Sequence, residues 1–254
     1  MTGKVYLVGS GPGKEGLLTQ DARKIIDRAD VVLFDQLPGE EILASLPDRA
    51  EKIDCGKFGG HHVLEQDEIE ALIVDRAKKG KLVVRLKGGD PFLFGRGGEE
   101  LETVRKAGVP VEMVPGISSA LAVPASVGIP LTHRKYASQV TILTGNEDPT
   151  KNESALDWQL LAKSRGTIVV LMGVANLKKI ADVLMSNGKP GKTPVAIIER
   201  GLRKDRRVTP GTLATIGNVA QNAGVKPPAV IVIGDVVNLY DPDNPDLIPY
   251  GMMM

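Results

Sequence analysis

The sequence has few of the residues on which disulfides and metal sites depend. Its 254 residues include a single cysteine, Cys55, and only three histidines. One cysteine excludes an intrachain disulfide and fits a reducing cytoplasm. His61, His62 and His133, together with that cysteine, do not form a clustered ligand set, so we expect no metal site.

Excess charge and long apolar runs are also lacking. Lysine and arginine (32) nearly balance aspartate and glutamate (31), and the net charge of +1 does not favour a general nucleic-acid or membrane-surface binder. No apolar run approaches the roughly 20 residues that span a bilayer. A predicted strand begins directly after Lys4, which leaves no room for a secretory signal. We therefore expect a soluble, cytoplasmic protein, with 42% hydrophobic residues available for a core.

Three catalytic signatures are incomplete. Gly9–Gly13 follows a predicted strand and Asp35 ends the next one, as in dinucleotide-binding folds. However, the third glycine of that pattern would fall on Lys14, and Pro12 lacks the N–H that a pyrophosphate needs. A P-loop fails because Ser186 stands where its first glycine would be, and the Gly-x-Ser-x-Gly pattern of hydrolases is absent.

The first half of the sequence alternates strand-like runs with helical patterns. Such alternation predicts a parallel sheet covered by helices, in which ligands bind at the carboxyl ends of the strands. The predicted strands are Val5–Val8, Val31–Phe34, Lys52–Asp54, Leu82–Leu86 and Val111–Val114.

The second half is also predicted to be α/β, with strands at Val140–Leu143, Thr167–Met172, Val195–Ile198 and Val230–Ile233 and helices at Leu177–Met185 and Ile216–Gln221. Small residues dominate the stretch from Pro115 to Arg134, which favours a well-packed connector. We predict an N-terminal domain over 1–115, a connector over 116–134, a C-terminal domain over 135–240 and an irregular tail over 241–254.

The most unusual stretch is Val83–Glu100, which reads as a strand, a tight loop and a helix start. Its glycines are costly in chain entropy and pack poorly, and Pro91 restricts Asp90 to extended geometry. Phe92 and Phe94 add aromatic surface. This composition indicates that a ligand approaches the loop backbone closely.

Four motifs resemble the tetrapyrrole methylase family: Val5–Gly13, Leu17–Thr19, Arg85–Glu100 and Gly128–Arg134. The likeness extends from about Val5 to Val237. It implies two α/β domains with S-adenosylmethionine held in the cleft between them, in a homodimer. The match is strongest to the members that methylate uroporphyrinogen III twice, giving precorrin-2 for sirohaem or cobalamin.

The resemblance implies a set of site residues. Asp35 and Lys57 occupy the positions of the family's proposed base and acid. A methylated pyrrole must lose a proton, so a carboxylate such as Asp35 can act as the base. Either residue could instead simply hold the substrate. Leu93 and Met172 could enclose the adenine of the donor, and glycines would admit its edge. The donor-binding positions are Pro12, Gly88, Gly89, Asp90, Leu93, Ser118, Ser119, Met172, Gly201 and Ala229.

A substrate with eight carboxylates calls for guanidinium groups in the cleft. The candidates are Arg85, Lys87, Arg96, Arg134 and the run Arg200–Arg207. The sequence departs from the family at Asn146, where a histidine is usual, and at Leu171, where a tyrosine is common. Ser118 replaces a common threonine, and Ser119 replaces a usual alanine.

Three hypotheses stay open at this point. The first is the double methylation of uroporphyrinogen III. The second keeps methyl transfer but changes the substrate to a later precorrin or to a macromolecule of translation. The third is a non-catalytic sensor that binds S-adenosylmethionine or a tetrapyrrole.

Overall fold

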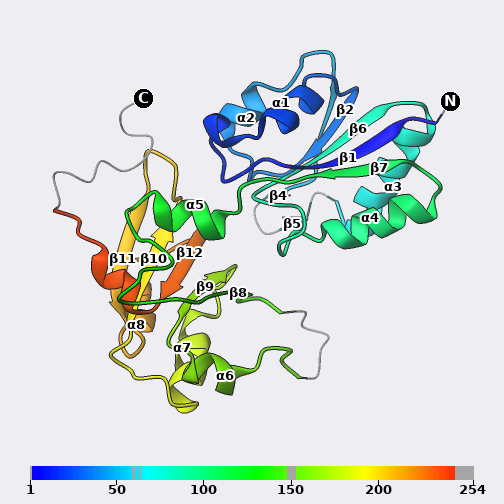
Figure 1. The fold of residues 1–254 in the computed structure, drawn as a ribbon. Coiled ribbons are helices and arrows are strands. Elements are labelled where there is room, and N and C mark those ends of the chain that lie inside the picture. The colour runs from blue at the N-terminus through cyan, green and yellow to red at the C-terminus, as the bar shows by residue number, and fades with distance from the viewer. Residues whose placement is uncertain (1, 59–60, 63, 148–152, 244–254) are drawn as a thin grey trace. The chain divides into compact units, whose positions relative to one another are not determined.

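The computed structural model describes residues 2–58, 61–62, 64–147 and 153–243, with backbone alone for 57–58 and 61–62. Contacts within the chain divide it into two compact units, Met1–Ser119 and Ala120–Met254 (Figure 1). This division falls inside the stretch 116–134. Each unit is an α/β domain, as predicted, and each is built on its own five-stranded sheet. The expected tail lies outside the described residues from position 244 onward.

The first unit contains a fully parallel sheet with the strand order β3-β2-β6-β1-β7. Its central strand β6 (Leu82–Lys87) is buried on both faces, which explains the nearly continuous apolar run in its sequence. The other strands are β1 (Lys4–Gly9), β2 (Val31–Phe34), β3 (Glu51–Asp54) and β7 (Val111–Val114), and a short hairpin joins β4 (Lys57–Phe58) to β5 (His61–His62).

Helices cover both faces of this sheet. On one face, α1 (Gln20–Ile26) and α2 (Glu40–Ala44) pack against β-strand residues such as Val8 and Leu86. On the other face, α3 (Gln66–Lys78) and α4 (Gly97–Lys106) pack against Leu7, Leu33 and Val83. A short 3-10 helix, η1 (Glu15–Leu17), follows β1. The apolar faces of these helices therefore form two cores, one on each side of the sheet.

The second unit contains a mixed sheet with the order β11-β10-β12-β9-β8. Only β8 and β9 are parallel neighbours. The strands are β8 (Val140–Thr144), β9 (Thr167–Leu171), β10 (Pro194–Glu199), β11 (Arg207–Thr212) and β12 (Ala229–Ile233). The helices are α5 (Ser119–Ala125), α6 (Trp158–Lys163), α7 (Leu177–Ser186), α8 (Ile216–Asn222) and the 3-10 helix η2 (Asp235–Leu239).

Strand β11 was not predicted from the sequence. Its segment begins with an arginine and carries Pro210, which cannot donate a ladder hydrogen bond. The strand is at the edge of the sheet, where one side has no neighbouring strand that needs an N–H donor, so the proline is tolerated. Among the described residues, no helix is both long and apolar enough to cross a membrane.

Candidate functional site

The predicted site residues of the first unit follow the carboxyl ends of its parallel strands. Pro12 comes after β1, Asp35 directly after β2, and Gly88–Asp90 directly after β6. Ser118 follows β7 and precedes α5. Because carboxyl ends of parallel strands lie at one edge of the sheet, these residues share that edge.

Glycines bring the loops at this edge into close contact. Gly11 and Gly89 exchange two backbone hydrogen bonds, with N···O distances of 3.1 and 2.7 Å. A Cβ atom on Gly116 would lie 2.2 Å from the Gly89 carbonyl oxygen and 2.8 Å from Gly9. Only a residue without a side chain fits there, so the glycines hold three strand-end loops together.

Asp90 connects two of these loops through both of its carboxylate oxygens. Oδ1 accepts a hydrogen bond from the N–H of Phe92 at 2.9 Å, and Oδ2 accepts one from the N–H of Gly116 at 3.1 Å. The Leu93 N–H donates to the Asp90 carbonyl at 3.3 Å. Asp90 is only partly buried, so its oriented carboxylate keeps lone pairs for a ligand.

Backbone strain marks the same loops. In the described part of the chain, the left-handed residues other than glycine are Phe94, Arg96, Met172 and Arg200, with φ between 49° and 58°. Such conformations cost about 1–3 kcal/mol each and tend to occur at functional sites. Phe94 and Arg96 lie in the loop after β6, Met172 follows β9, and Arg200 follows β10.

The three predicted donor positions of the second unit also share one sheet edge. Met172 follows β9, and the last residue of β9, Leu171, pairs with Val230 of β12. Glu199, which ends β10, pairs with Ala229, which begins β12. Since both of these pairings are antiparallel, Met172, Gly201 and Ala229 come together at this edge.

Gly201 is a point of close packing within the second unit. A Cβ atom there would lie 2.4 Å from a methyl carbon of Val123 in α5. The Ser126 hydroxyl donates a hydrogen bond to the Gly201 carbonyl at 3.0 Å. The absence of a side chain therefore lets α5 pack against the loop that follows β10.

The predicted acid–base residues are only partly described. The N–H of Leu37 donates to Oδ1 of Asp35 at 2.8 Å, which orients the half-buried carboxylate. Lys57 lies in β4, and its side chain is outside the described part of the structure.

The predicted substrate arginines differ in exposure. Arg96 and Arg134 are exposed, as a carboxylate-binding fork requires. Arg85 is 5% exposed, and its guanidinium contacts Glu100 and the Leu86 carbonyl. A role for Arg85 in substrate binding stays a prediction that finds no support in this geometry.

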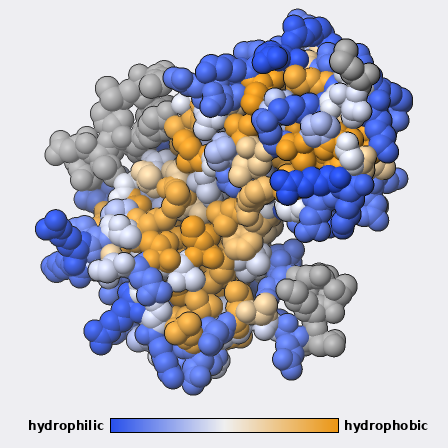
Figure 2. All heavy atoms as spheres, turned by 45° about the vertical axis from the view of Figure 1, so that its right-hand side comes forward, coloured by the Kyte–Doolittle hydropathy of each residue, from blue (hydrophilic) through white to orange (hydrophobic). Residues whose placement is uncertain are grey.

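Large apolar side chains are exposed beside the polar loops. Leu37, Phe92 and Phe94 are 52%, 49% and 40% exposed on the first unit, and Met172 is 50% exposed on the second. Both units show orange, apolar atoms at the surface in Figure 2. Exposed aromatic and aliphatic groups next to fixed polar groups are typical of small-molecule sites.

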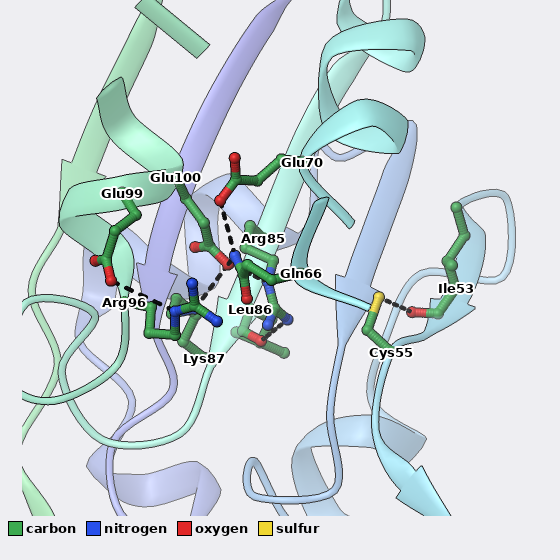
Figure 3. A network of polar contacts seen from close by, with 10 residues as sticks. All are labelled: Ile53, Cys55, Gln66, Glu70, Arg85, Leu86, Lys87, Arg96, Glu99 and Glu100. Carbon is green, nitrogen blue, oxygen red and sulfur yellow. Dashed lines mark hydrogen bonds and ion pairs between the residues drawn. The ribbon is translucent and has the colours of Figure 1, made fainter. Parts of the chain in front are cut away.

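Two buried glutamates were missed by reasoning from the sequence. Glu100 lies on α4 and contacts Arg85 and Lys87 (Figure 3). Glu199 ends β10, and its carboxylate accepts hydrogen bonds from Arg207 Nε at 2.5 Å and from the N–H of Lys226 at 2.9 Å. Their sequence signal is position: each acidic residue lies where the local helix or strand pattern faces the core.

Burial alone would raise the pKa of the Glu199 carboxyl. Its hydrogen bonds from Arg207 and Lys226, with the charges of Arg207 and Arg200, instead hold that pKa below the ordinary value. Burial also raises the pKa of the Cys55 thiol, which is enclosed in the core of the first unit. Cys55 is therefore suited to packing rather than to reaction.

Residues 4–217 match the model of the family described as Tetrapyrrole (Corrin/Porphyrin) Methylases. The chain belongs to the tetrapyrrole methylase family. The motifs from Val5 to Arg134 that suggested this family lie within the matched range, and the fold is the one that the resemblance implied.

Full-length relatives of this tetrapyrrole methylase share its sequence closely. The S-adenosyl-L-methionine-dependent uroporphyrinogen III methyltransferase of Methanosarcina barkeri is 59% identical over 239 residues, 94% of both chains. The uroporphyrinogen-III C-methyltransferase of Methanocaldococcus jannaschii is 50% identical over 95% of this chain and 99% of its own. A crystal structure of the Thermus thermophilus uroporphyrin-III C-methyltransferase, complexed with S-adenyl homocysteine, superposes with a TM-score of 0.79. It is 38% identical and covers 93% of this chain and 94% of its own.

Proposed function

We propose that this tetrapyrrole methylase transfers two methyl groups from S-adenosylmethionine to carbons of uroporphyrinogen III, giving precorrin-2. The observation that carries the proposal is the high identity, over nearly the full length of both chains, to two proteins named as uroporphyrinogen III methyltransferases. The macromolecular and sensor alternatives have no comparable support.

The residues present fit the methyl donor. At the edge of the first sheet, Gly88 and Gly89 are only partly buried, and Gly88 packs so closely on Leu37 that a Cβ atom there would lie 2.4 Å from Cβ of Leu37. Asp90 presents a fixed carboxylate, and Leu93 is half-buried beside it. At the edge of the second sheet, Met172 presents an apolar side chain.

When bound, the donor supplies an electrophilic methyl group. Each transfer forms a carbon–carbon bond and breaks the sulfur–methyl bond. The methylated ring carbon already carries a side chain and no hydrogen, so the tetrapyrrole then loses a proton from a ring nitrogen or a bridging carbon. We assign that proton to Asp35, with Lys57 as the accompanying acid. Because Asp35 is oriented by the Leu37 N–H, the carboxylate needs little rearrangement to accept the proton. Alignment of donor and acceptor supplies most of the acceleration.

The substrate carboxylates require cations at the rim. We assign this role to Arg96 and Arg134, whose exposed side chains support the assignment. Arg96 also pairs with Glu99 across 3.4 Å, an exposed interaction that a substrate carboxylate can replace at little cost.

A cytoplasmic homodimer completes the proposal. The compartment is supported by the single cysteine, which is free and buried. The dimer is supported by the family resemblance, and sedimentation of the purified protein tests it.

The decisive experiment is anaerobic incubation of the purified protein with uroporphyrinogen III and S-adenosylmethionine, followed by mass spectrometry. We expect a product heavier by two methyl groups and more than one turnover for each protein molecule. Folded protein that binds the donor but leaves uroporphyrinogen III unchanged would overturn the substrate assignment. Methylation of a precorrin offered in parallel would then identify the later substrate, and a lack of turnover with every tetrapyrrole would indicate a sensor.

A further inference from the structure

Lys87 and Glu100 flank the loop that the donor is proposed to contact. Lys87 is the last residue of β6, and Glu100 lies in the first turn of α4, which begins at Gly97. Lys87 Nζ is 2.9 Å from Oε1 of Glu100, and their side chains are 7% and 0% exposed. One buried ion pair thus joins the two ends of the loop 88–96.

Two further donors converge on the same carboxylate oxygen. Arg85 Nε lies 3.1 Å from Oε1 of Glu100, and Gln66 Nε2 of α3 lies 3.3 Å from it. Figure 3 shows the three side chains directed at Glu100 from β6 and α3. Gln66 also contacts Glu70, which accepts a hydrogen bond from Thr103 of α4. The network therefore fixes α4 relative to both β6 and α3.

This arrangement is expensive for stability alone. Three ionisable groups are withdrawn from water, and a buried ion pair is often no more stabilising than packed apolar side chains. Oε2 of Glu100 is buried without a hydrogen-bond partner among the described residues. Burial, and next the charge of Arg85, lower the pKa of Lys87, while Glu100 acts against this shift. A role in geometry explains the network better than a role in stability.

The loop needs such fixation because its backbone is strained. Phe94 and Arg96 both adopt left-handed conformations, with φ of 55° and 58°. Such residues keep these angles only when the surroundings impose them. Asp90, at the start of the loop, must also keep its carboxylate aligned with the Gly116 N–H. Separation of the loop ends would release both constraints.

We propose that Lys87 and Glu100 form a buried clamp, the Lys87–Glu100 clamp, which positions the loop 88–96 for binding of S-adenosylmethionine. Both are positioning residues that act through Asp90 and its neighbours. Lys87 is thereby assigned to the loop rather than to the substrate carboxylates. The inference rests on the proposed function, because the ligand of the loop is the proposed donor.

The test compares donor affinity among folded variants by calorimetric titration with S-adenosylmethionine. Glu100→Gln keeps the shape but presents an amide to three hydrogen-bond donors, and Lys87→Met removes the cation but keeps the stem. We expect each to weaken donor binding about tenfold or more, because small misplacements of site groups cost up to about 10²-fold. Lys87→Arg should recover part of the loss.

Glu102→Gln is the matched control, since Glu102 lies on the same helix in an exposed pair with Lys106. It should bind the donor like the wild type. A purely structural role would lower the melting temperature of Glu100→Gln and Lys87→Met but leave their donor affinity unchanged, with KM values for both substrates as in the wild type. That result overturns the clamp. If Glu100→Gln does not fold, the donor affinity of Lys87→Met decides the test. Wild-type protein that binds no donor would overturn the proposed function itself.

Discussion

The carboxylate of Asp90 accepts a hydrogen bond from the Gly116 N–H, 3.1 Å from Oδ2, and so connects the loop after β6 to the loop after β7. The same carboxylate accepts from Phe92 through Oδ1. The Asp90 side chain therefore holds two loops of the proposed donor site together, although Gly116 is far from Asp90 in the sequence.

Substitution of Asp90 should separate donor binding from folding. Asp90→Asn leaves one acceptor oxygen and places an NH₂ group against a backbone N–H, while Asp90→Ala removes both acceptors. We expect donor affinity to fall about tenfold or more in each, since a charge-assisted hydrogen bond is worth about 1.5–3 kcal/mol. Calorimetric titration measures the loss and circular dichroism monitors the fold. Unchanged affinity in folded Asp90→Ala would show that the loop does not receive the donor.

Gly116→Ala should disrupt the contact between strand-end loops. Its Cβ atom would lie 2.2 Å from the Gly89 carbonyl oxygen, and backbone atoms cannot swing aside as a flexible side chain can. We expect destabilisation by about 1–3 kcal/mol from the forced shift, together with weaker donor binding.

Gly98→Ala is the control for Gly116→Ala. Gly98 lies in the first turn of α4, where a Cβ atom would meet nothing within 4 Å. Alanine there should leave stability equal or up to about 1 kcal/mol higher. Urea unfolding of both variants makes the comparison. Equal stabilities for the two would contradict the close approach of Gly9, Gly89 and Gly116.

Strands dominated by β-branched residues could be predicted closely from the sequence. β2 and β7 have the predicted bounds, because runs such as Val31–Phe34 have no competing pattern. β11 could not be predicted, since Pro210 argues for a turn unless the strand is known to be at an edge. The residue pattern of a segment indicates its own conformational preference, whereas its position at the edge of a sheet is known only once the sheet has assembled.

The parts of the site that lie within a sequence motif could be predicted, whereas the parts that depend on tertiary contacts could not. Gly88–Asp90 could be identified from the glycine-rich loop after a strand. The partner of Arg85 could not, because Glu100 contacts it only when α4 packs on the face of the sheet. A charged residue in an otherwise apolar central strand indicates that a buried partner of opposite charge exists. By this criterion, Arg85 and Lys87 are both interpreted as partners of a buried acid rather than as substrate ligands.

Glu199 should make the free energy of unfolding depend on pH in the acid range. Hydrogen bonds and charges hold the pKa of its carboxyl below the ordinary 4.5. Its contribution to the free energy of unfolding is therefore fully present above about pH 4.5 and is lost as the pH falls through the lowered pKa. Glu199→Gln should be less stable at neutral pH by about 2 kcal/mol, because Arg207 and the Lys226 N–H lose a charged acceptor and hydrogen bonds to charged groups are worth about 1.5–3 kcal/mol.

The difference between Glu199→Gln and the wild type should shrink as the pH falls below 4.5. Glu102→Gln is a control, since Glu102 pairs with Lys106 through a single exposed contact at the surface and should contribute little. Urea unfolding at a series of pH values measures both variants. A difference that stays constant with pH would mean that the Glu199 charge does not contribute to stability.

Met172 allows strain and binding to be separated in one residue. Its φ of 55° is unfavourable for any side chain, and the side chain is half-exposed, so folding gains little from it. Met172→Gly removes the strain of about 1–2 kcal/mol but adds freedom to the unfolded chain worth about 0.5–1 kcal/mol. We therefore expect stability equal to or slightly above that of the wild type.

Donor binding by Met172→Gly should weaken about tenfold, because the apolar contact proposed for the adenine is lost. Met172→Leu, which keeps both the strain and an apolar side chain, should bind nearly as the wild type does. Thermal melting and calorimetric titration of the two variants give both quantities. If Met172→Gly bound the donor normally, Met172 would have no part in the site. If Met172→Gly were strongly destabilised, the Met172 side chain would serve packing instead. A variant that gains stability when the strain is removed but binds the donor more weakly would show that the strained residue is kept for binding.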